Sequence, residues 1–230
     1  MRSSNPVSAS LHEQFERIYQ FFLNYIPKNL PQEPGLKISA RYHPLEILGG
    51  DFYDFLELRP GLRGLAIADV VGHGATAAMM MGALRLLLRM YTREIASAAM
   101  PVALVNNALV DYAPDRDMAS MTYIMIDQKD RTLTYCNAGH PAAFFYSART
   151  DRVTLLSEGG PILGVDKMNY DEQTLRVEPG DRLMLHTDGW DESANVSGEC
   201  FDLLACVQAL GWQQPADTLL SGVDEAFDEF

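Results

Sequence analysis

The sequence predicts a layered α+β sandwich, and three observations lead to this fold class. Short apolar or alternating segments bounded by Gly, Pro and Asp recur through the middle of the chain, as expected of strands joined by turns. Helical segments come in pairs, one pair among the strands and one at the carboxyl end, whereas a parallel sheet needs strands and helices in alternation. A chain of 230 residues that is 47% hydrophobic can also bury the sizeable core that such layers require.

The first expected element is an amphipathic helix near the amino terminus. Ser10 and Glu13 have the spacing of a capping box, and the helix would carry an apolar stripe formed by Leu11, Phe15, Ile18, Phe22 and Ile26. Prolines at positions 27, 31 and 34 end it. The stripe is compatible with packing on the domain, with pairing to a second copy as a homodimer, and with continuing an upstream linker helix. We assign residues 1–35 to this helix and linker, and residues 36–230 to the main domain.

Strand patterns follow the prolines. Residues 37–42 alternate, and a Gly-Gly loop leads into a strand over Asp51–Leu58. A turn at Gly61–Gly64 then precedes the compact apolar run Leu65–Ala68, which ends at Asp69.

Two helices are expected next. Residues 75–91 contain good helix formers without Pro, and the expected core face consists of Met80, Leu84, Leu87 and Tyr91. The second helix begins near Pro101, which suits a first helical turn, and its core face would carry Val102, Val105, Leu109 and Tyr112. The positive end of the first helix faces the acidic loop that precedes it.

The second half of the chain contains further strands and the last pair of helices. Met121–Asp127 and Thr132–Asn137 predict a hairpin, because a polar turn joins them. Four more strands are expected over residues 142–146, 152–156, 172–177 and 182–186, and two helices over residues 201–210 and 216–230.

Charge and cysteine content exclude several classes of function. The net charge is −13, with 18 basic and 31 acidic residues, and nucleic acid is not an expected partner because its recognition needs clustered Lys and Arg. The sequence shows no signal peptide and no apolar run of about 18 residues, which gives no indication of export or of a membrane partner. The cysteines have no CxxC spacing and lie in apolar surroundings, which predicts buried reduced thiols and favours the cytoplasm; they are Cys136, Cys200 and Cys206.

Three acidic, glycine-flanked loops follow apolar or strand-like segments, at Gly49–Asp54, Asp69–Gly74 and Thr187–Glu192. Carboxylates gathered at strand ends raise each other's pKa unless cations lie between them. Glycine lets backbone carbonyls and hydrated ions approach closely. The loops therefore predict a divalent-metal site.

Several motifs occur in a specific order, namely GGDFYDF, IADVVGHGATAAMMM, MTYIMID, NAGHP, GGPILGV and LHTDGWDES. In this order they resemble the bacterial PP2C-type (PPM) serine/threonine phosphatases related to the sporulation phosphatase SpoIIE and to RsbU-like stress-response phosphatases that regulate sigma-factor partner switches. The resemblance runs from about residue 36 to about residue 225. It implies an αββα sandwich of two antiparallel sheets flanked by helix pairs, with two Mn²⁺ or Mg²⁺ ions between the sheets.

The resemblance also assigns roles to residues. Asp69 matches the aspartate that bridges both ions, and Val70 matches the residue whose backbone carbonyl binds one of them. Asp188 matches an aspartate on the second ion, and Asp51 matches the acidic residue that supports the first ion directly or through water. Oxygen ligands suit such hard cations, and water held between two of them loses a proton near neutral pH and can attack phosphorus.

Other residues carry expectations with open alternatives. His73 is a candidate general acid for the leaving oxygen, although a solvated loop histidine gives the same pattern and relatives often have lysine there. Asp54, Asp191 and Glu192 are candidates for a third metal or for supporting the metal ligands; the alternative is an exposed turn for Asp54 and a surface position for the other two. The Asn137–His140 segment is expected to hold a tight loop near the sheets.

The sequence departs from the family pattern after its last helix. Family members continue to an Asp-Asp-(Ile or Met)-Thr strand whose aspartate completes the second metal site, and this motif is absent here. The alternatives are a truncation, a natural variant, or substitution by Asp224 or Asp228. The second ion is then expected to bind more weakly.

The leading hypothesis is a metal-dependent protein phosphatase that hydrolyses phosphoserine or phosphothreonine of a regulatory protein of the anti-sigma-factor antagonist type. The alternative is a catalytically weak or inactive pseudophosphatase that acts as a protein-binding module. A cyclic-dinucleotide synthase, suggested by Gly49–Phe52, is disfavoured because its signature needs an acidic residue directly after Asp51, where Phe52 stands.

Overall fold

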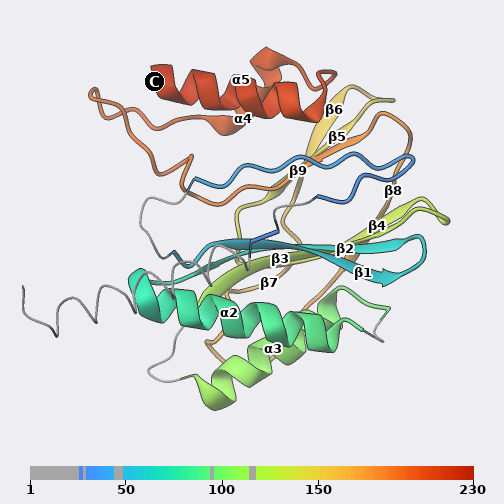
Figure 1. Ribbon diagram of the computed structural model, residues 1–230, viewed down its shortest axis with the longest axis vertical. Helices are drawn as coiled ribbons and strands as arrows, with labels where there is room; N and C mark the ends of the chain where they lie inside the picture. Colours follow the sequence, from blue (N-terminus) through green and yellow to red (C-terminus); the bar gives the residue numbers. More distant parts are fainter. Residues whose placement is uncertain (1–25, 28–29, 44–48, 94–95, 114–117) are drawn as a thin grey trace, which may run out of the picture.

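The computed structural model describes residues 26–27, 30–43, 49–93, 96–113 and 118–230. These residues form two stacked β-sheets with one pair of helices on each outer face (Figure 1). The predicted αββα sandwich is therefore confirmed. The helix expected over residues 10–26, and with it the expected dimer contact, lies outside the described residues except at Ile26.

The larger sheet has six strands and carries most of the candidate metal ligands. Its order is β1-β2-β3-β4-β7, and β8 also pairs with β4. All pairs are antiparallel except β4 with β7. The strands are β1 (Phe52–Arg59), β2 (Leu62–Val70), β3 (Ala119–Asp127), β4 (Thr132–Ala138), β7 (Gly159–Gly160) and β8 (Gln173–Arg176).

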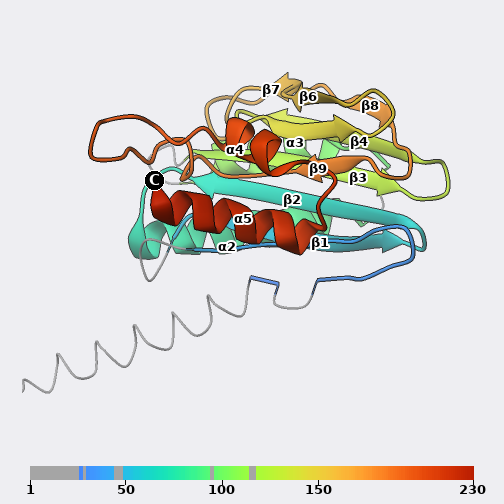
Figure 2. The same cartoon turned by 90° about the horizontal axis from the view of Figure 1, so that it is seen from above.

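The smaller sheet has the order β6-β5-β9 and is antiparallel throughout. Its strands are β5 (Ala143–Ser147), β6 (Arg152–Leu156) and β9 (Arg182–Met184). The helices are α2 (Gly74–Tyr91), α3 (Ala99–Tyr112), α4 (Leu203–Leu210) and α5 (Ala216–Glu229). Helices α2 and α3 cover the larger sheet and α4 and α5 lie over the smaller one, with α5 running roughly along the direction of β2 when seen from above (Figure 2). No helix among the described residues is both long and apolar enough to cross a membrane.

Three apolar clusters correspond to the three interfaces between layers. The first joins the larger sheet to α2 and α3 and includes Phe52, Ala68, Met81 and Leu84. The second joins the smaller sheet to α4 and α5 and includes Phe144, Trp212, Leu203 and Val223. The third lies between the sheets and includes Leu65, Ile124, Tyr135, Phe145 and Leu156. Burial of apolar side chains on both sides of each sheet is what holds such layers together.

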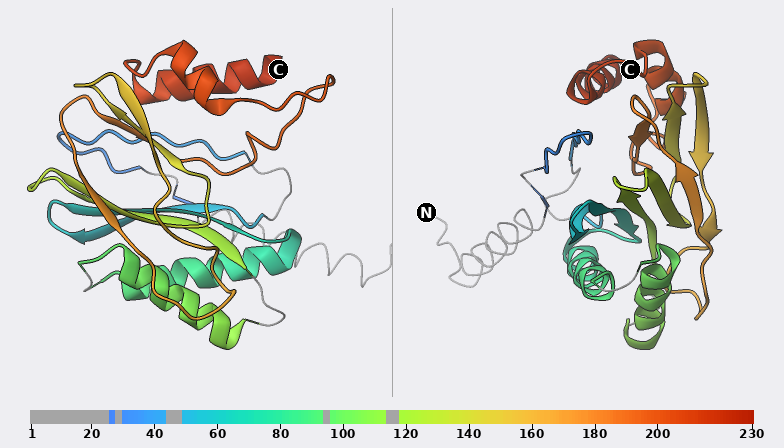
Figure 3. Two further views of the ribbon diagram at one scale, coloured as in Figure 1. Left: turned by 180° about the vertical axis from the view of Figure 1, so that it is seen from behind. Right: turned by 90° about the vertical axis from the view of Figure 1, so that its right-hand side faces the viewer.

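Three details differ from the sequence-based expectations. The segment 37–42 forms no strand: it runs between the larger sheet and α5 (Figure 3), and the carbonyl of Ile38 accepts a hydrogen bond from the Gln32 side chain at 3.0 Å. Tyr112 is 85% exposed, because it is the last residue of α3 and lies past the edge of the core. Cys200 is exposed in a loop, whereas Cys136 is buried and burial raises the pKa of its thiol to about 12.

The core face of α2 is also shifted by one residue from the predicted stripe. The buried side chains are Ala77, Ala78, Met81, Leu84 and Leu88, while the predicted Met80, Leu87 and Tyr91 are partly buried at its margin. Small residues in the first turns let the helix lie close to the sheet next to the end of β2.

Candidate metal centre

Asp51 and Asp69 meet because of the register between β1 and β2. The strands are antiparallel with Phe52 opposite Ala68, so the same register carried one residue further sets Asp51 opposite Asp69. Residues opposite each other in a sheet point to the same face. Phe52 and Ala68 belong to the core beneath the helices, and strand alternation therefore turns both aspartates to the other face, between the two sheets.

The two carboxyl groups are in hydrogen-bond contact. Burial raises the pKa of Asp69, and its hydrogen bond to Asp51 and the charges of Asp51, Asp188 and Glu192 raise it further. Burial also raises the pKa of Asp51, with the charge of Asp188 adding to the effect. Without a cation, the pair is therefore most stable when the two groups share a proton.

The smaller sheet supplies the third aspartate. The chain leaves β9 and reaches Thr187, whose side chain hydrogen-bonds Asp51, and then Asp188, which is half-buried and close enough for its charge to act on both other aspartates. The Asp188 carbonyl accepts a hydrogen bond from the Glu192 backbone N–H at 2.8 Å, which closes a turn. The predicted ligands thus come from both sheets and meet between them.

An aromatic cluster holds the turn that follows Asp188. The ring of Trp190 packs against Phe227 of α5, with centroids 4.8 Å apart, and against Phe201, with centroids 6.0 Å apart. Two of these rings also contact each other, Phe201 and Phe227, at 5.2 Å. The position of Asp188 is therefore linked to the outer helix layer through a side chain two residues away.

Gly50 allows the chain before β1 to lie directly on the end of β2. A Cβ atom at position 50 would be 2.6 Å from the Val70 carbonyl oxygen, a separation that real side chains do not adopt, and 3.1 Å from the Val70 Cβ. The glycine thus lets Asp51 and the Val70 carbonyl, two candidate ligands, occupy neighbouring positions.

His73 lies where α2 begins. It precedes Gly74 in an extended conformation and its side chain makes no capping hydrogen bond to the helix. Together with residues 70–72, Thr76, Ala77 and Met80, it lines a surface depression of about 220 Å³. The exposed His73 therefore shares a depression with Val70 at the positive end of a helix, a position that suits contact with an anionic group.

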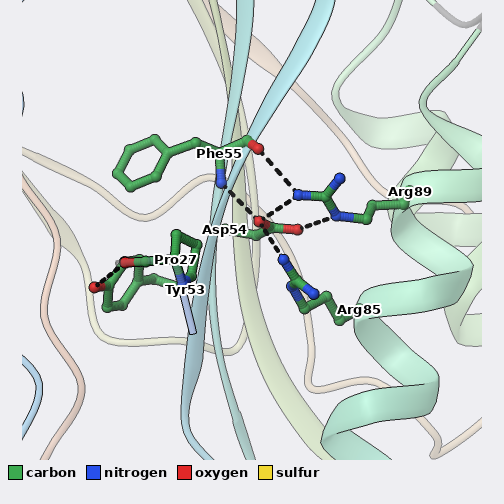
Figure 4. Close-up of polar contacts among 6 residues, drawn as sticks. All are labelled: Pro27, Tyr53, Asp54, Phe55, Arg85 and Arg89. Atoms are coloured by element: carbon green, nitrogen blue, oxygen red, sulfur yellow. Dashed lines mark hydrogen bonds and ion pairs between the residues drawn. The ribbon is translucent and has the colours of Figure 1, made fainter. Parts of the chain in front are cut away.

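Asp54 is not part of this cluster. It lies on the helix-facing side of β1 with 0% of its side chain exposed, and Arg85 and Arg89 of α2 bind both of its oxygens (Figure 4). Arg85 Nη2 is 2.9 Å from Oδ1, and Arg89 Nε is 2.6 Å from Oδ2. Arg89 Nη2 lies 2.7 Å from Oδ1, which also accepts the Phe55 backbone N–H at 2.9 Å. Neither expectation for Asp54 holds, because its carboxylate anchors α2 to β1.

Two signals in the sequence point to this anchor. Asp51 directly precedes β1 and Asp54 lies three residues further along, so strand alternation places them on opposite faces. Arg85 and Arg89 are four residues apart and share one face of α2. A buried carboxylate on the helix-facing side of a strand requires such partners.

The remaining acidic candidates fall into two groups. Glu192 is exposed but acts on the pKa of Asp69, so it belongs to the edge of the acidic cluster. Asp191 turns toward His186, with Oδ2 3.7 Å from Nδ1. Asp224, considered above as a substitute ligand, is paired with Arg41 at 3.3 Å and so contacts the segment before the sheets; Asp228 is exposed on α5.

The donor set fits divalent cations. Among the described residues, no three His, Cys, Asp or Glu side chains already have the arrangement of a complete metal-binding group. The fit rests on chemistry: burial raises the pKa of both half-buried carboxyls, Asp51 and Asp69, the charge of Asp188 raises both further, and cations would relieve the repulsion. Oxygen ligands of this kind match Mg²⁺ and Mn²⁺.

Comparison with known proteins shows the family. The sequence model of the protein family described as stage II sporulation protein E (SpoIIE) matches residues 60–230 of this chain. The chain belongs to the SpoIIE family. Phosphoserine phosphatase RsbU of Bacillus subtilis (strain 168) is 29% identical to it over 171 residues, which cover 74% of this chain and 50% of RsbU.

Solved structures show the same architecture. The RsbU and RsbW domains of a Mycobacterium tuberculosis protein match with a TM-score of 0.66 and 26% identity, over 80% of this chain and 52% of that one. The SiaA PP2C domain of Pseudomonas aeruginosa matches with a TM-score of 0.78 over 98% of this chain and 92% of that one; at 16% identity this likeness concerns the fold. The chain spans half or less of the length of the curated relatives that it matches.

Proposed function

We propose that this SpoIIE-family chain is an Mn²⁺- or Mg²⁺-dependent phosphatase that removes phosphate from serine or threonine of a regulatory protein. The observation that carries the proposal is the register that sets Asp51 opposite Asp69, with Asp188 brought to the pair from the other sheet. In this proposal Asp69, the Val70 carbonyl, Asp51 and Asp188 hold two ions. The bound ions would neutralise the charge of the phosphate and activate water for attack on phosphorus.

The residues around the ligands supply orientation. Thr187 hydrogen-bonds Asp51 and so orients its carboxyl group. Gly50 keeps space beside the Val70 carbonyl, and the amino end of α2 favours the negative charge of a phosphate at the depression. His73 lines the same depression and can give a proton to the oxygen that leaves phosphorus.

His73→Gln tests the last role. We expect the variant to slow hydrolysis of an alkyl phosphate by about 100-fold, which is within the usual effect of a general acid, and to slow p-nitrophenyl phosphate much less because p-nitrophenolate leaves without protonation. The ratio of kcat values on the two substrates is the measurement. Equal losses on both substrates would make His73 a structural residue.

The relatives support the choice of substrate. RsbU, which matches 74% of this chain, is named as a phosphoserine phosphatase. The Mycobacterium tuberculosis structure holds an RsbU domain and an RsbW domain in one protein. We therefore propose a phosphorylated protein of a sigma-factor partner switch, of the anti-sigma-factor antagonist type, as the substrate.

The alternative function is a pseudophosphatase that only binds a partner, and it is favoured by the lack of a complete metal-binding group among the described residues. Hydrolysis of p-nitrophenyl phosphate and of a phosphoserine protein with Mn²⁺, with Mg²⁺ and with a chelator separates the two. We expect turnover that requires either ion and stops with the chelator. A folded chain that binds the phosphoprotein but shows no turnover at millimolar Mn²⁺ would establish the alternative.

A further inference from the structure

A buried histidine lies next to the candidate metal centre without belonging to it. His140 is 6% exposed and follows β4 in the loop Asn137–Pro141. The Asn137 side chain bonds both backbone groups of His140: its Nδ2 donates to the carbonyl at 2.9 Å, and its Oδ1 accepts the N–H at 2.8 Å. The loop therefore holds His140 in one position.

A glycine makes this loop conformation possible. Gly139 has a φ of 67°, and a Cβ atom there would lie 2.7 Å from the Ile162 backbone N. The loop thus presses against the segment that follows β7, and its N–H at Gly139 donates to the Gly160 carbonyl at 3.0 Å. Such close contact limits the ways in which the histidine can move.

His140 is joined to the strand beside Asp69. Its Nδ1 lies 2.7 Å from the Oγ of Ser120, and both residues are buried. Ser120 is the residue of β3 that stands opposite Asp69 of β2. Side chains at such a pair share a face of the sheet, so the hydroxyl and the carboxyl of Asp69 are neighbours between the sheets.

His140 is also next to the segment that carries Asp188. In the antiparallel pair of β5 and β9, Phe144 stands opposite Met184. Residues 140–142 lead into β5 and residues 185–188 follow β9, so both segments extend from the same end of this antiparallel pair. The Phe144 and His186 rings are 4.8 Å apart, which shows the two segments in contact there.

The His140 ring also reaches the backbone of His186, two residues before Asp188. Both rings are buried, with His140 6% and His186 5% exposed. Burial and the nearby His186 lower the pKa of His140 to about 4, so its ring is neutral at neutral pH. A neutral ring can hold its hydrogen bonds without bringing a positive charge close to the cations proposed here.

We infer that His140 is a positioning residue that joins the strand beside Asp69 to the segment of Asp188, and so sets the separation between the two halves of the metal centre. This inference rests on the proposed function. His140 follows β4 of the larger sheet and bonds to Ser120 opposite Asp69, and its ring reaches the His186 backbone in the segment that follows β9 of the smaller sheet. Loss of the contact lets the halves move apart, which weakens cation binding more than it slows the chemical step.

The test is the dissociation constant for Mn²⁺, obtained from the electron paramagnetic resonance signal of free Mn²⁺. It compares three variants with the unaltered chain: Ser120→Ala, His140→Leu and His140→Asn. We expect Ser120→Ala and His140→Leu to raise the dissociation constant about tenfold, the lower end of what residues behind metal ligands cost. His140→Asn should keep more affinity, because an amide atom can take the place of Nδ1. The kcat at saturating Mn²⁺ should stay within about twofold, the pattern of a residue that acts on binding.

Thr122→Val is the matched control. Thr122 lies two residues from Ser120 in β3, is 0% exposed, and its hydroxyl has no partner among the described residues. This variant should bind Mn²⁺ as the unaltered chain does. The double variant Ser120→Ala/His140→Leu should bind no more weakly than either single one, because both remove one shared contact.

Two outcomes overturn the inference. If Ser120→Ala and His140→Leu bind Mn²⁺ like Thr122→Val, the contact does not set the site; if His140→Leu fails to fold, Ser120→Ala decides alone. Asp69→Asn distinguishes failure of this inference from failure of the proposed function. If Asp69→Asn loses Mn²⁺ binding while the Ser120 and His140 variants keep it, only the role of His140 is refuted. If Asp69→Asn keeps Mn²⁺ binding, both the metal centre and this inference are refuted.

Discussion

Asp69→Asn should abolish Mn²⁺-dependent phosphatase activity. The side chain lies opposite Asp51 and within reach of the charge of Asp188, so it is the candidate that can contact both ions. Bound cations supply several kcal/mol of transition-state stabilisation, and their loss corresponds to a fall in kcat/KM of at least about 10²- to 10³-fold. Steady-state hydrolysis of p-nitrophenyl phosphate across a range of Mn²⁺ concentrations measures it.

The folded structure of Asp69→Asn should be unharmed. Burial and the charges of Asp51, Asp188 and Glu192 all disfavour a charged Asp69, so its replacement by a neutral amide relieves an unfavourable interaction, and the free energy of unfolding in chelator should stay equal or increase. Asp130→Asn is a control with the same chemical change on the exposed turn between β3 and β4, and should retain full activity. Unchanged turnover in Asp69→Asn would contradict the assignment of the metal centre.

Asp54→Ala should cause the largest loss of stability. It removes a fully buried carboxylate that binds two arginines, and breaking such a pair leaves charge without its partner. The expected loss is about 3 kcal/mol of unfolding free energy, at the low end for buried pairs because Arg89 is partly exposed and can reach water. Urea unfolding followed by circular dichroism measures it.

Glu57→Ala is the control for this variant. Glu57 is in the same strand and pairs with Arg63 at 3.3 Å, but its side chain is 71% exposed. Its loss should change the unfolding free energy by less than about 1 kcal/mol. The folded fraction of Asp54→Ala should bind Mn²⁺ with unaltered affinity. A variant that keeps its stability and loses Mn²⁺ binding would instead make Asp54 a metal ligand.

Much of the fold could be predicted from local patterns. The alternation of residues 121–127 and 132–137 with a polar turn predicts the β3–β4 hairpin, and the four helices are found within a few residues of their predicted ends. The segment 37–42 shows the limit of such reasoning. Its alternation resembles a strand, but a strand needs a neighbour with free backbone groups, and no strand among the described residues pairs with this segment.

The candidate site could be predicted in part. Loops at Asp51, Asp69 and Asp188 were recognisable from glycine, acidic residues and apolar neighbours, and the structure brings the three together. The distinction between Asp51 and Asp54 depends on which face of β1 each occupies, and therefore on strand pairing. The contact of His140 with Ser120 joins residues 20 positions apart. It depends on how β3 pairs with β2 and β4, and local sequence patterns do not specify that pairing.

The packing of Trp190 provides a built-in optical reporter. The chain has 2 tryptophans, and Trp212 is stacked on Tyr146 in the outer core, with ring centroids 5.5 Å apart. Trp190 lies two residues after Asp188, between Phe201 and Phe227, so its indole moves with the segment that carries the candidate ligand. In Trp212→Phe all remaining tryptophan emission comes from Trp190, and adding Mg²⁺ should change its intensity in step with occupancy. Cation binding to this chain could then be followed by fluorescence without an attached dye.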